Sequence, residues 1–145
     1  MNLFSFVNDV KISLEILEIA ADNTTYYGTG VDMAKYRHVV FIGAVLKGET
    51  KTNSMKVQQD TASNFGTAAD LLGTSVDLST TASVDGLAMV EVKHVQERYV
   101  RPALVVANWS TPTAACVIGI AWGRTQYPDT NTGSELHVAP AEGTA

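Results

Sequence analysis

The sequence predicts an all-β protein in which about eight strands pack as a sandwich of two sheets. Two observations predict this fold. Segments of strand length alternate apolar and polar residues, with clusters of turn-forming residues between them, and no segment shows a convincing long helical pattern. We prefer a jelly-roll topology, although periodicity alone does not define the order of the strands.

Three strands are predicted in the first third of the chain. Residues 10–16 alternate without a break, which places their aliphatic side chains on one face; residues 17–20 would also fit a helix, but β-branched residues favour a continued strand. Residues 26–32 combine aromatic residues with glycines and predict a short, bulged strand. Residues 37–46 are apolar over most of their length, which predicts a central strand covered on both faces.

Longer polar connections separate the remaining strands. Residues 61–85 form a polar excursion that carries one short strand near 75–79. Residues 99–109 predict a strand whose Pro102 cannot donate a ladder hydrogen bond, so we expect that end of the strand at a sheet edge or a bulge. Further strands are predicted at 55–60, 87–93 and 115–123.

The length of 145 residues fits one compact domain. We expect an N-terminal arm at residues 1–9, the β-sandwich domain at 10–124 and an extended or mobile C-terminal tail at 125–145. The start of the chain has no basic segment followed by a long apolar run, so no secretory signal is expected. No segment approaches the roughly 20 apolar residues that span a bilayer, so no membrane partner is expected.

Charge and composition restrict the partners further. A net charge of −5 leaves little basic surface for phosphate groups, so we expect no direct contact with nucleic acid. Charged residues make up 17% of the chain, a low fraction that favours surface covered in an assembly; a β-domain of low charge that stays alone is the alternative. Cys116 lies within an apolar run and is interpreted as a small buried hydrophobe.

No pattern of catalytic or metal-binding residues is found. The three histidines are scattered and are interpreted as structural, and a lone cysteine adds no zinc site, so no catalytic residue, metal or cofactor is expected. Acidic residues of the polar excursion and its flanks are expected to cap their own turns rather than bind calcium. These residues are His38, His94 and His137, and Asp60, Asp70, Asp77 and Asp85.

One candidate function, an alternative to the one that the motifs described next imply, is a carbohydrate- or receptor-binding β-module of a phage tail or surface structure. Trp109, Trp122 and Tyr26 would then be platforms on which sugars stack. Because both tryptophans adjoin apolar strands, packing in a core or an interface is the favoured interpretation.

Several short motifs follow one another in a recognisable order: Val31-Asp32-Met33, Val39-Val40-Phe41, Val57-Gln58-Gln59-Asp60 and Arg98-Tyr99-Val100-Arg101. In this order and spacing the chain resembles the capsid decoration proteins of tailed bacteriophages, also known as cement or head-stabilising proteins. The likeness covers about residues 10–128. The apolar N-terminal addition and the longer polar C-terminal tail depart from the family's pattern.

The resemblance implies a virion protein, made in the host cytoplasm, that has no enzymatic activity. It implies a homotrimer bound to the outer surface of an icosahedral head, where it cements adjacent subunits of the major capsid protein. Apolar residues of the N-terminal arm are our candidate contacts with the capsid or with a neighbouring subunit, or else they close the chain's own sandwich. They are Leu3, Phe4, Phe6 and Val7.

Overall fold

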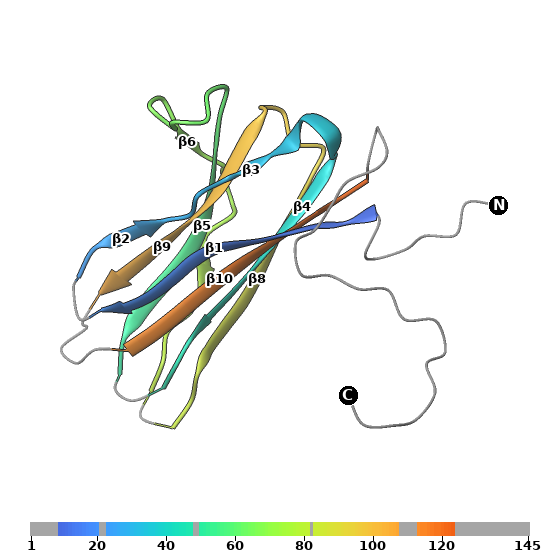
Figure 1. Cartoon of the computed structure of the whole chain (residues 1–145). Helices are drawn as coiled ribbons and strands as arrows, with labels where there is room; N and C mark the ends of the chain where they lie inside the picture. The colour runs from blue at the N-terminus through green and yellow to red at the C-terminus, as the bar shows by residue number, and fades with distance from the viewer. Residues whose placement is uncertain (1–8, 21–22, 48–49, 82, 108–112, 124–145) are drawn as a thin grey trace, which may run out of the picture.

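Two antiparallel sheets pack against each other in the structure (Figure 1). The computed structural model describes residues 9–20, 23–47, 50–81, 83–107 and 113–123. Within these ranges the regular structure is ten strands and one 3₁₀ turn, η1 (Met33–Lys35). The all-β sandwich predicted from the sequence is therefore confirmed.

The strands divide between a four-stranded and a six-stranded sheet. Sheet A has the order β1 (Lys11–Ala20), β10 (Thr113–Trp122), β4 (His38–Val45) and β8 (Gly86–Lys93). Sheet B has the order β2 (Thr25–Tyr27), β9 (Tyr99–Ala107), β5 (Thr52–Asp60) and β6 (Ala69–Asp70). In addition, β3 (Val31–Asp32) pairs with β9, and β7 (Val76–Asp77) pairs with β5.

The strand order is that of a jelly roll. β2 and β3 occupy one position beside β9, and β6 and β7 occupy one position beside β5, so the described strands fill eight positions. The first position pairs with the last, the second with the seventh, the third with the sixth and the fourth with the fifth. The expected topology is thus confirmed, and two divided positions account for the larger number of strands.

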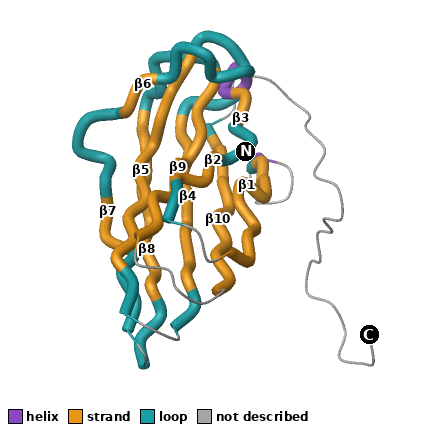
Figure 2. The backbone as a smooth tube through the Cα atoms, turned by 90° about the vertical axis from the view of Figure 1, so that its left-hand side faces the viewer, coloured by secondary structure: helices purple, strands orange, loops and turns teal. Residues whose placement is uncertain are grey.

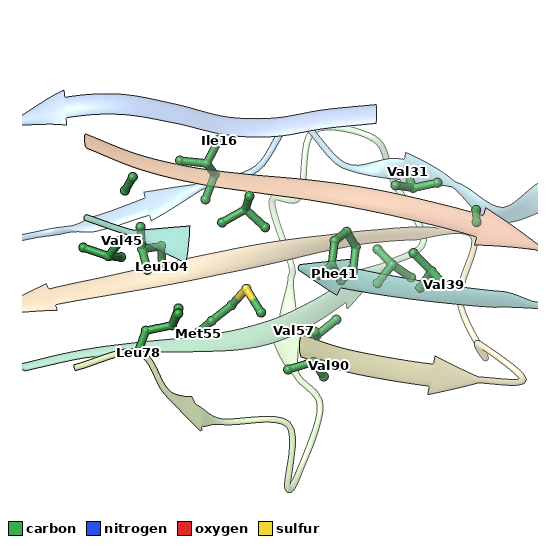
Figure 3. Close-up of a cluster of buried hydrophobic side chains, with 14 of the residues drawn as sticks. Ile16, Val31, Val39, Phe41, Val45, Met55, Val57, Leu78, Val90 and Leu104 are labelled. Carbon is green, nitrogen blue, oxygen red and sulfur yellow. The ribbon is translucent and has the colours of Figure 1, made fainter. Parts of the chain in front are cut away.

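Side chains from both sheets meet in one apolar core (Figure 3). Phe41 and Val117 of sheet A and Met55 and Leu104 of sheet B are completely buried. Full burial of a side chain of this size contributes about 1.5–3 kcal/mol. Gly119 lets the Phe41 ring lie close to β10, since a Cβ atom at this glycine would come within 3.0 Å of Cε1 of Phe41. This core fixes which side of each strand faces inward.

Strand β1 changes face at a β-bulge. Its register with β10 shifts between Leu14 and Ile16, so that Leu14 is 54% exposed whereas Ile16 is only 4% exposed. The buried Glu15 carboxylate accepts hydrogen bonds from the backbone N–H of Gly30 at 2.7 Å and from the hydroxyl of Thr29 at 3.4 Å. The prediction that the aliphatic residues of 10–16 share one face is wrong, because this bulge turns Ile16 inward.

Pro102 lies in the interior of sheet B. Strand β9 has β5 on one side and β2 and β3 on the other, so of the two expected places the sheet edge is wrong, and Pro102 lies instead at an irregularity of the ladder. The Pro102 carbonyl accepts a hydrogen bond from the backbone N–H of Gly28 at 2.9 Å, at the break between β2 and β3. The nitrogen of a strand residue points to the same side as its carbonyl, so the missing N–H falls where the ladder is already interrupted.

Other boundaries differ in detail from the predictions. The polar excursion carries two short strands, β6 and β7, rather than the one predicted. Periodicity could not indicate β6, because both of its residues are exposed and show no apolar alternation. Strand β5 begins at Thr52 rather than at residue 55. Figure 2 shows β6 and β7 on the opposite margin of the sandwich from β1. Residues 1–8 of the predicted arm and the predicted tail at 125–145 lie outside the described residues.

Within the ranges described above, no helix is both long enough and apolar enough to cross a membrane.

Replacing Glu15 with alanine is expected to lower the free energy of unfolding by about 1–3 kcal/mol, because the partly buried N–H of Gly30 loses its acceptor. Urea titration followed by circular dichroism measures this loss. Glu18→Ala, a change of the same kind on the same strand but at a less buried carboxylate, is the control. Equal losses in the two variants would contradict a role for Glu15 in joining β1 to the β2–β3 connection.

Candidate assembly surface

The outward side of sheet A is apolar along all four of its strands. The pairing register aligns outward residues in rows that run across the sheet, and the middle row contains Leu14, Ile118, Ile42 and Met89. Adjacent rows continue the pattern on both sides. We call this surface the apolar face, and it consists of Ile12, Leu14, Leu17, Val40, Ile42, Ala44, Leu87, Met89, Cys116, Ile118 and Ile120.

Several of these side chains are largely open to solvent in the single chain. Leu17 is 65% exposed, Leu87 72% and Met89 65%. In β4 the inward residues are buried and the outward residues only half-buried, in strict alternation. The central position predicted for residues 37–46 is confirmed, but cover on both faces is not, because the single chain covers only the inner face of β4.

Cys116 belongs to the apolar face. It is a free cysteine of intermediate exposure, paired in register with Leu17 on one side and Ala44 on the other. Its neighbours along β10, Ala115 and Val117, are the buried residues. The interpretation of Cys116 as a buried residue is therefore wrong for the single chain, because strand alternation turns it outward.

The outward side of sheet B is polar, and its groups bond to one another. Asp70 accepts a hydrogen bond from the Gln58 amide at 2.8 Å, and the Gln58 oxygen accepts one from Nε of Arg101 at 3.0 Å. The Arg101 guanidinium lies over two rings, 4.3 Å from the centroid of Tyr27 and 4.4 Å from that of Phe65. Such stacking favours a cation at a half-exposed site. The two outer sides of the sandwich thus differ in kind.

Three of the four short motifs singled out in the sequence meet in sheet B, whereas Val39-Val40-Phe41 lies on β4 in sheet A. Val31 and Asp32 of β3 pair with Val100 and Tyr99 of β9. Asp32 receives two hydrogen bonds from the guanidinium of Arg98, at 3.0 and 2.8 Å, and these bonds hold the pKa of its carboxyl below the ordinary value. These three motifs are therefore cross-strand partners, and Asp32 and Arg98 form an ion pair between two of them.

A cavity of about 300 Å³ lies beside this ion pair, where β1 approaches β3 and η1. Its lining includes Lys11, Lys35, Tyr36 and Arg98. Arg98 is bound bidentately to Asp32, so the positive charge of Arg98 at this cavity is already paired within the protein.

Two histidines that are far apart in the sequence meet at one end of the apolar face. The rings of His38 and His94 are 5.0 Å apart, and the Trp122 ring lies 5.6 Å from His38. Nδ1 of His38 is buried without a hydrogen-bond partner in the described structure. Burial lowers the pKa of His38, and the nearby charge of His94 acts in the same direction. No sequence pattern indicates this pair, because His38 and His94 come together only through the pairing of β4 with β8.

Asp60 and Asp77 cap their own turns, as predicted, whereas Asp70 and Asp85 bond to other segments of the chain. Asp60 accepts hydrogen bonds from the backbone N–H groups of Ala62 and Thr67, which lower the pKa of its carboxyl. The other three bind elsewhere: Asp70 to Lys56 and Gln58, Asp77 to Ser79, and Asp85 to the N–H of Lys47. Among the described residues, no group of three or more His, Cys, Asp or Glu side chains is placed to hold a metal ion.

Several candidates from the sequence lie outside the described residues: Leu3, Phe4, Phe6, Val7, Trp109 and His137. Tyr26 is partly buried and packs against the core rather than standing free as a stacking platform. Trp122 adjoins His38 at the end of the apolar face. The signal that could have located the apolar face was the two-sided apolar pattern of residues 37–46.

Comparisons with known proteins identify the fold but no family. No protein-family model and no curated protein matches the sequence. The structure is similar to that of the PBSX exported protein XepA, with 16% identity and a TM-score of 0.54 over 91% of this chain and 44% of XepA. The chain thus spans less than half the length of XepA.

Two further similar structures score lower. The SPBc2 prophage-derived protein YomS has 14% identity and a TM-score of 0.48, over 83% of this chain and 98% of YomS. The virus-like particle of the giant freshwater prawn Macrobrachium rosenbergii extra small virus has 8% identity and a TM-score of 0.33, over 83% of both chains. At such identities the likeness to XepA shows the fold alone, and the two lower scores carry no further conclusion.

The His38 site predicts how stability depends on pH. Because the pKa of His38 is lower in the folded protein than its ordinary value of 6.5, the unfolded chain binds a proton first as the pH falls. The free energy of unfolding is therefore expected to decrease as the pH falls from about 7.5 to about 5. His38→Gln should flatten this part of the profile, as measured by urea unfolding at fixed protein concentration.

His94→Gln is the matched control, because it removes a neighbouring charge but leaves His38 buried. Other charged groups act on His38 in both directions: Arg37 and Lys93 lower its pKa and Glu91 raises it. A His38→Gln profile as steep as that of the unchanged protein would show that another group causes the decrease.

Proposed function

We propose that this protein is a structural component of a phage virion. In this proposal it binds the outer surface of an icosahedral head as a homotrimer and cements adjacent subunits of the major capsid protein. The role requires no catalytic group and no cofactor, only a rigid body and adhesive surfaces.

The observation that carries the proposal is the contrast between the two outer sides of the sandwich. Sheet A presents a broad apolar surface, whereas the polar groups of sheet B bond to one another and suit contact with water. Contiguous exposed apolar surface marks an interaction site. A molecule with one adhesive side and one solvated side suits an assembly on the outer surface of a shell, where some of its surface contacts protein and the rest contacts solvent.

The resemblance to decoration proteins supports the same role. Three of its four motifs lie on adjacent strands of sheet B, where Asp32 binds Arg98 and Gln58 binds Arg101, and the fourth lies on β4 of sheet A. Most of the likeness therefore corresponds to one contiguous part of the fold. A jelly roll is a recurrent fold of viral shell proteins, which agrees with this role by analogy.

Cementing is a matter of multivalency. A trimer that touches several capsid subunits gains from each contact after the first, because the later contacts form at high effective concentration. Modest contacts are then enough to hold neighbouring subunits together. The N-terminal residues Leu3, Phe4, Phe6 and Val7 are the proposed contacts of the arm with the shell or with a neighbouring copy.

Binding to heads tests the proposal. The purified chain, added to expanded heads that lack it, should bind saturably, and cryo-electron microscopy should then show added density on the outer lattice near three-fold positions. Bare outer lattices on intact virions, with the polypeptide found elsewhere in the particle, would refute it. Binding to a glycan array instead of to heads would favour a carbohydrate-binding module.

Deleting residues 2–8 is expected to reduce occupancy on heads, because the apolar arm is lost while the strands from Lys11 onward are kept. Quantitative gel analysis of washed heads measures the occupancy. Deleting residues 139–145, a stretch of equal length at the other end of the chain that contains no large apolar residue, is the control. Unchanged occupancy after the N-terminal deletion would eliminate the arm as a contact.

A further inference from the structure

We infer that the apolar face of sheet A is the surface through which copies of this chain bind one another. The inference rests on the proposed function, since it gives an interface to the proposed trimer. Its occupant is a second copy, and in a trimer each face is shared between two neighbours.

The size of the apolar face is close to what a specific contact needs. Four strands spaced about 4.8 Å apart, with outward residues about 6.7 Å apart along each strand, give three rows a planar area of roughly 400 Å². Protruding side chains and the row that contains Trp122 enlarge this area. Two such surfaces together approach the total of about 1,000 Å² that separates a specific interface from a chance contact.

The charge distribution favours an identical partner. The middle row, from Leu14 to Met89, contains no charged side chain. The charges on this side of the sheet lie on β8, where Lys93 and Glu91 form a pair with 3.5 Å between Nζ and Oε1. A partner therefore needs no complementary charge, but it must itself be apolar and nearly flat. A second copy offers such a surface, and identical surfaces that meet around a symmetry axis bury one another.

The pattern of β4 supports the same conclusion. Residues 38–45 are apolar on both sides, as in a strand covered on both faces, yet the single chain buries only Val39, Phe41, Gly43 and Val45. Val40 and Ile42 remain half-exposed in the centre of the sheet. Packing against the sheet of another copy, with about 10 Å between sheets, supplies the missing cover.

Single substitutions on β8, the edge strand of sheet A, test the inference. Met89→Glu places a charge in the middle row at a side chain that is 65% exposed in the single chain, so the monomer should still fold. The unchanged protein is expected to sediment as an oligomer at micromolar concentration and Met89→Glu as a monomer. Leu72→Glu makes the same chemical change at a residue that is 99% exposed in the β6–β7 connection, and it should sediment like the unchanged protein.

Cys116 provides a second readout that does not depend on hydrodynamics. Because it lies on the apolar face between Leu17 and Ala44, association should shield its thiol. Its reaction with a water-soluble thiol reagent is expected to be at least tenfold faster in Met89→Glu than in the unchanged protein or in Leu72→Glu. Circular dichroism confirms that each variant is folded, and Leu87→Glu replaces Met89→Glu if that variant unfolds.

The outcomes separate this inference from the proposed function. A monomeric unchanged protein with a reactive Cys116 would overturn the inference, and loss of head binding by Met89→Glu would then assign the apolar face to the capsid. An oligomer that Met89→Glu leaves intact would also overturn it. An oligomer that Met89→Glu dissociates but that never binds heads would support the inference and refute the proposed function.

Discussion

Burial of one side of each sheet against the other is the constraint on which the rest of this structure depends. Phe41 and Val117 from sheet A meet Met55 and Leu104 from sheet B with no exposure to solvent. Because side chains alternate along a strand, fixing these inward residues also fixes which residues point outward. The apolar face and the hydrogen-bonded outer side of sheet B are consequences of the same register.

The edges of the sandwich show how local chemistry modifies that register. At β1, the bulge at Glu15 moves Ile16 into the core and leaves Ile12 and Leu14 outside, so one strand serves both the core and the apolar face. The Glu15 carboxylate also holds the β2–β3 connection through Gly30. At β9, the break between β2 and β3 accommodates Pro102 within a sheet. In both places a single residue, Glu15 or Pro102, is associated with a local break in the regular strand pairing.

Alternation and turn chemistry were enough to predict the all-β class, the positions of the long strands and the turn-capping roles of Asp60 and Asp77. They were not enough where the determining contact is non-local. The bulge at Glu15 depends on an acceptor for the distant Gly30, and the short strand β6 is defined by pairing with β5 rather than by its own exposed residues. The contact between His38 and His94 likewise exists only because β4 and β8 are adjacent. Short motifs indicated Asp32 and Arg98, but only the fold shows them as partners.

The low charge content and the apolar run at residues 37–46 both reflect a shortage of polar side chains for the outer surface of the sandwich. A chain with 17% charged residues has few groups with which to solvate its surface, and this chain concentrates its polar side chains on sheet B and its loops. Sheet A is left with β-branched and aliphatic residues outside as well as inside. Such a strand composition is typical of sheets that are covered on both faces. The contact between copies that we infer would cover this side of sheet A, because the same alternating positions that close the sandwich leave its other side apolar.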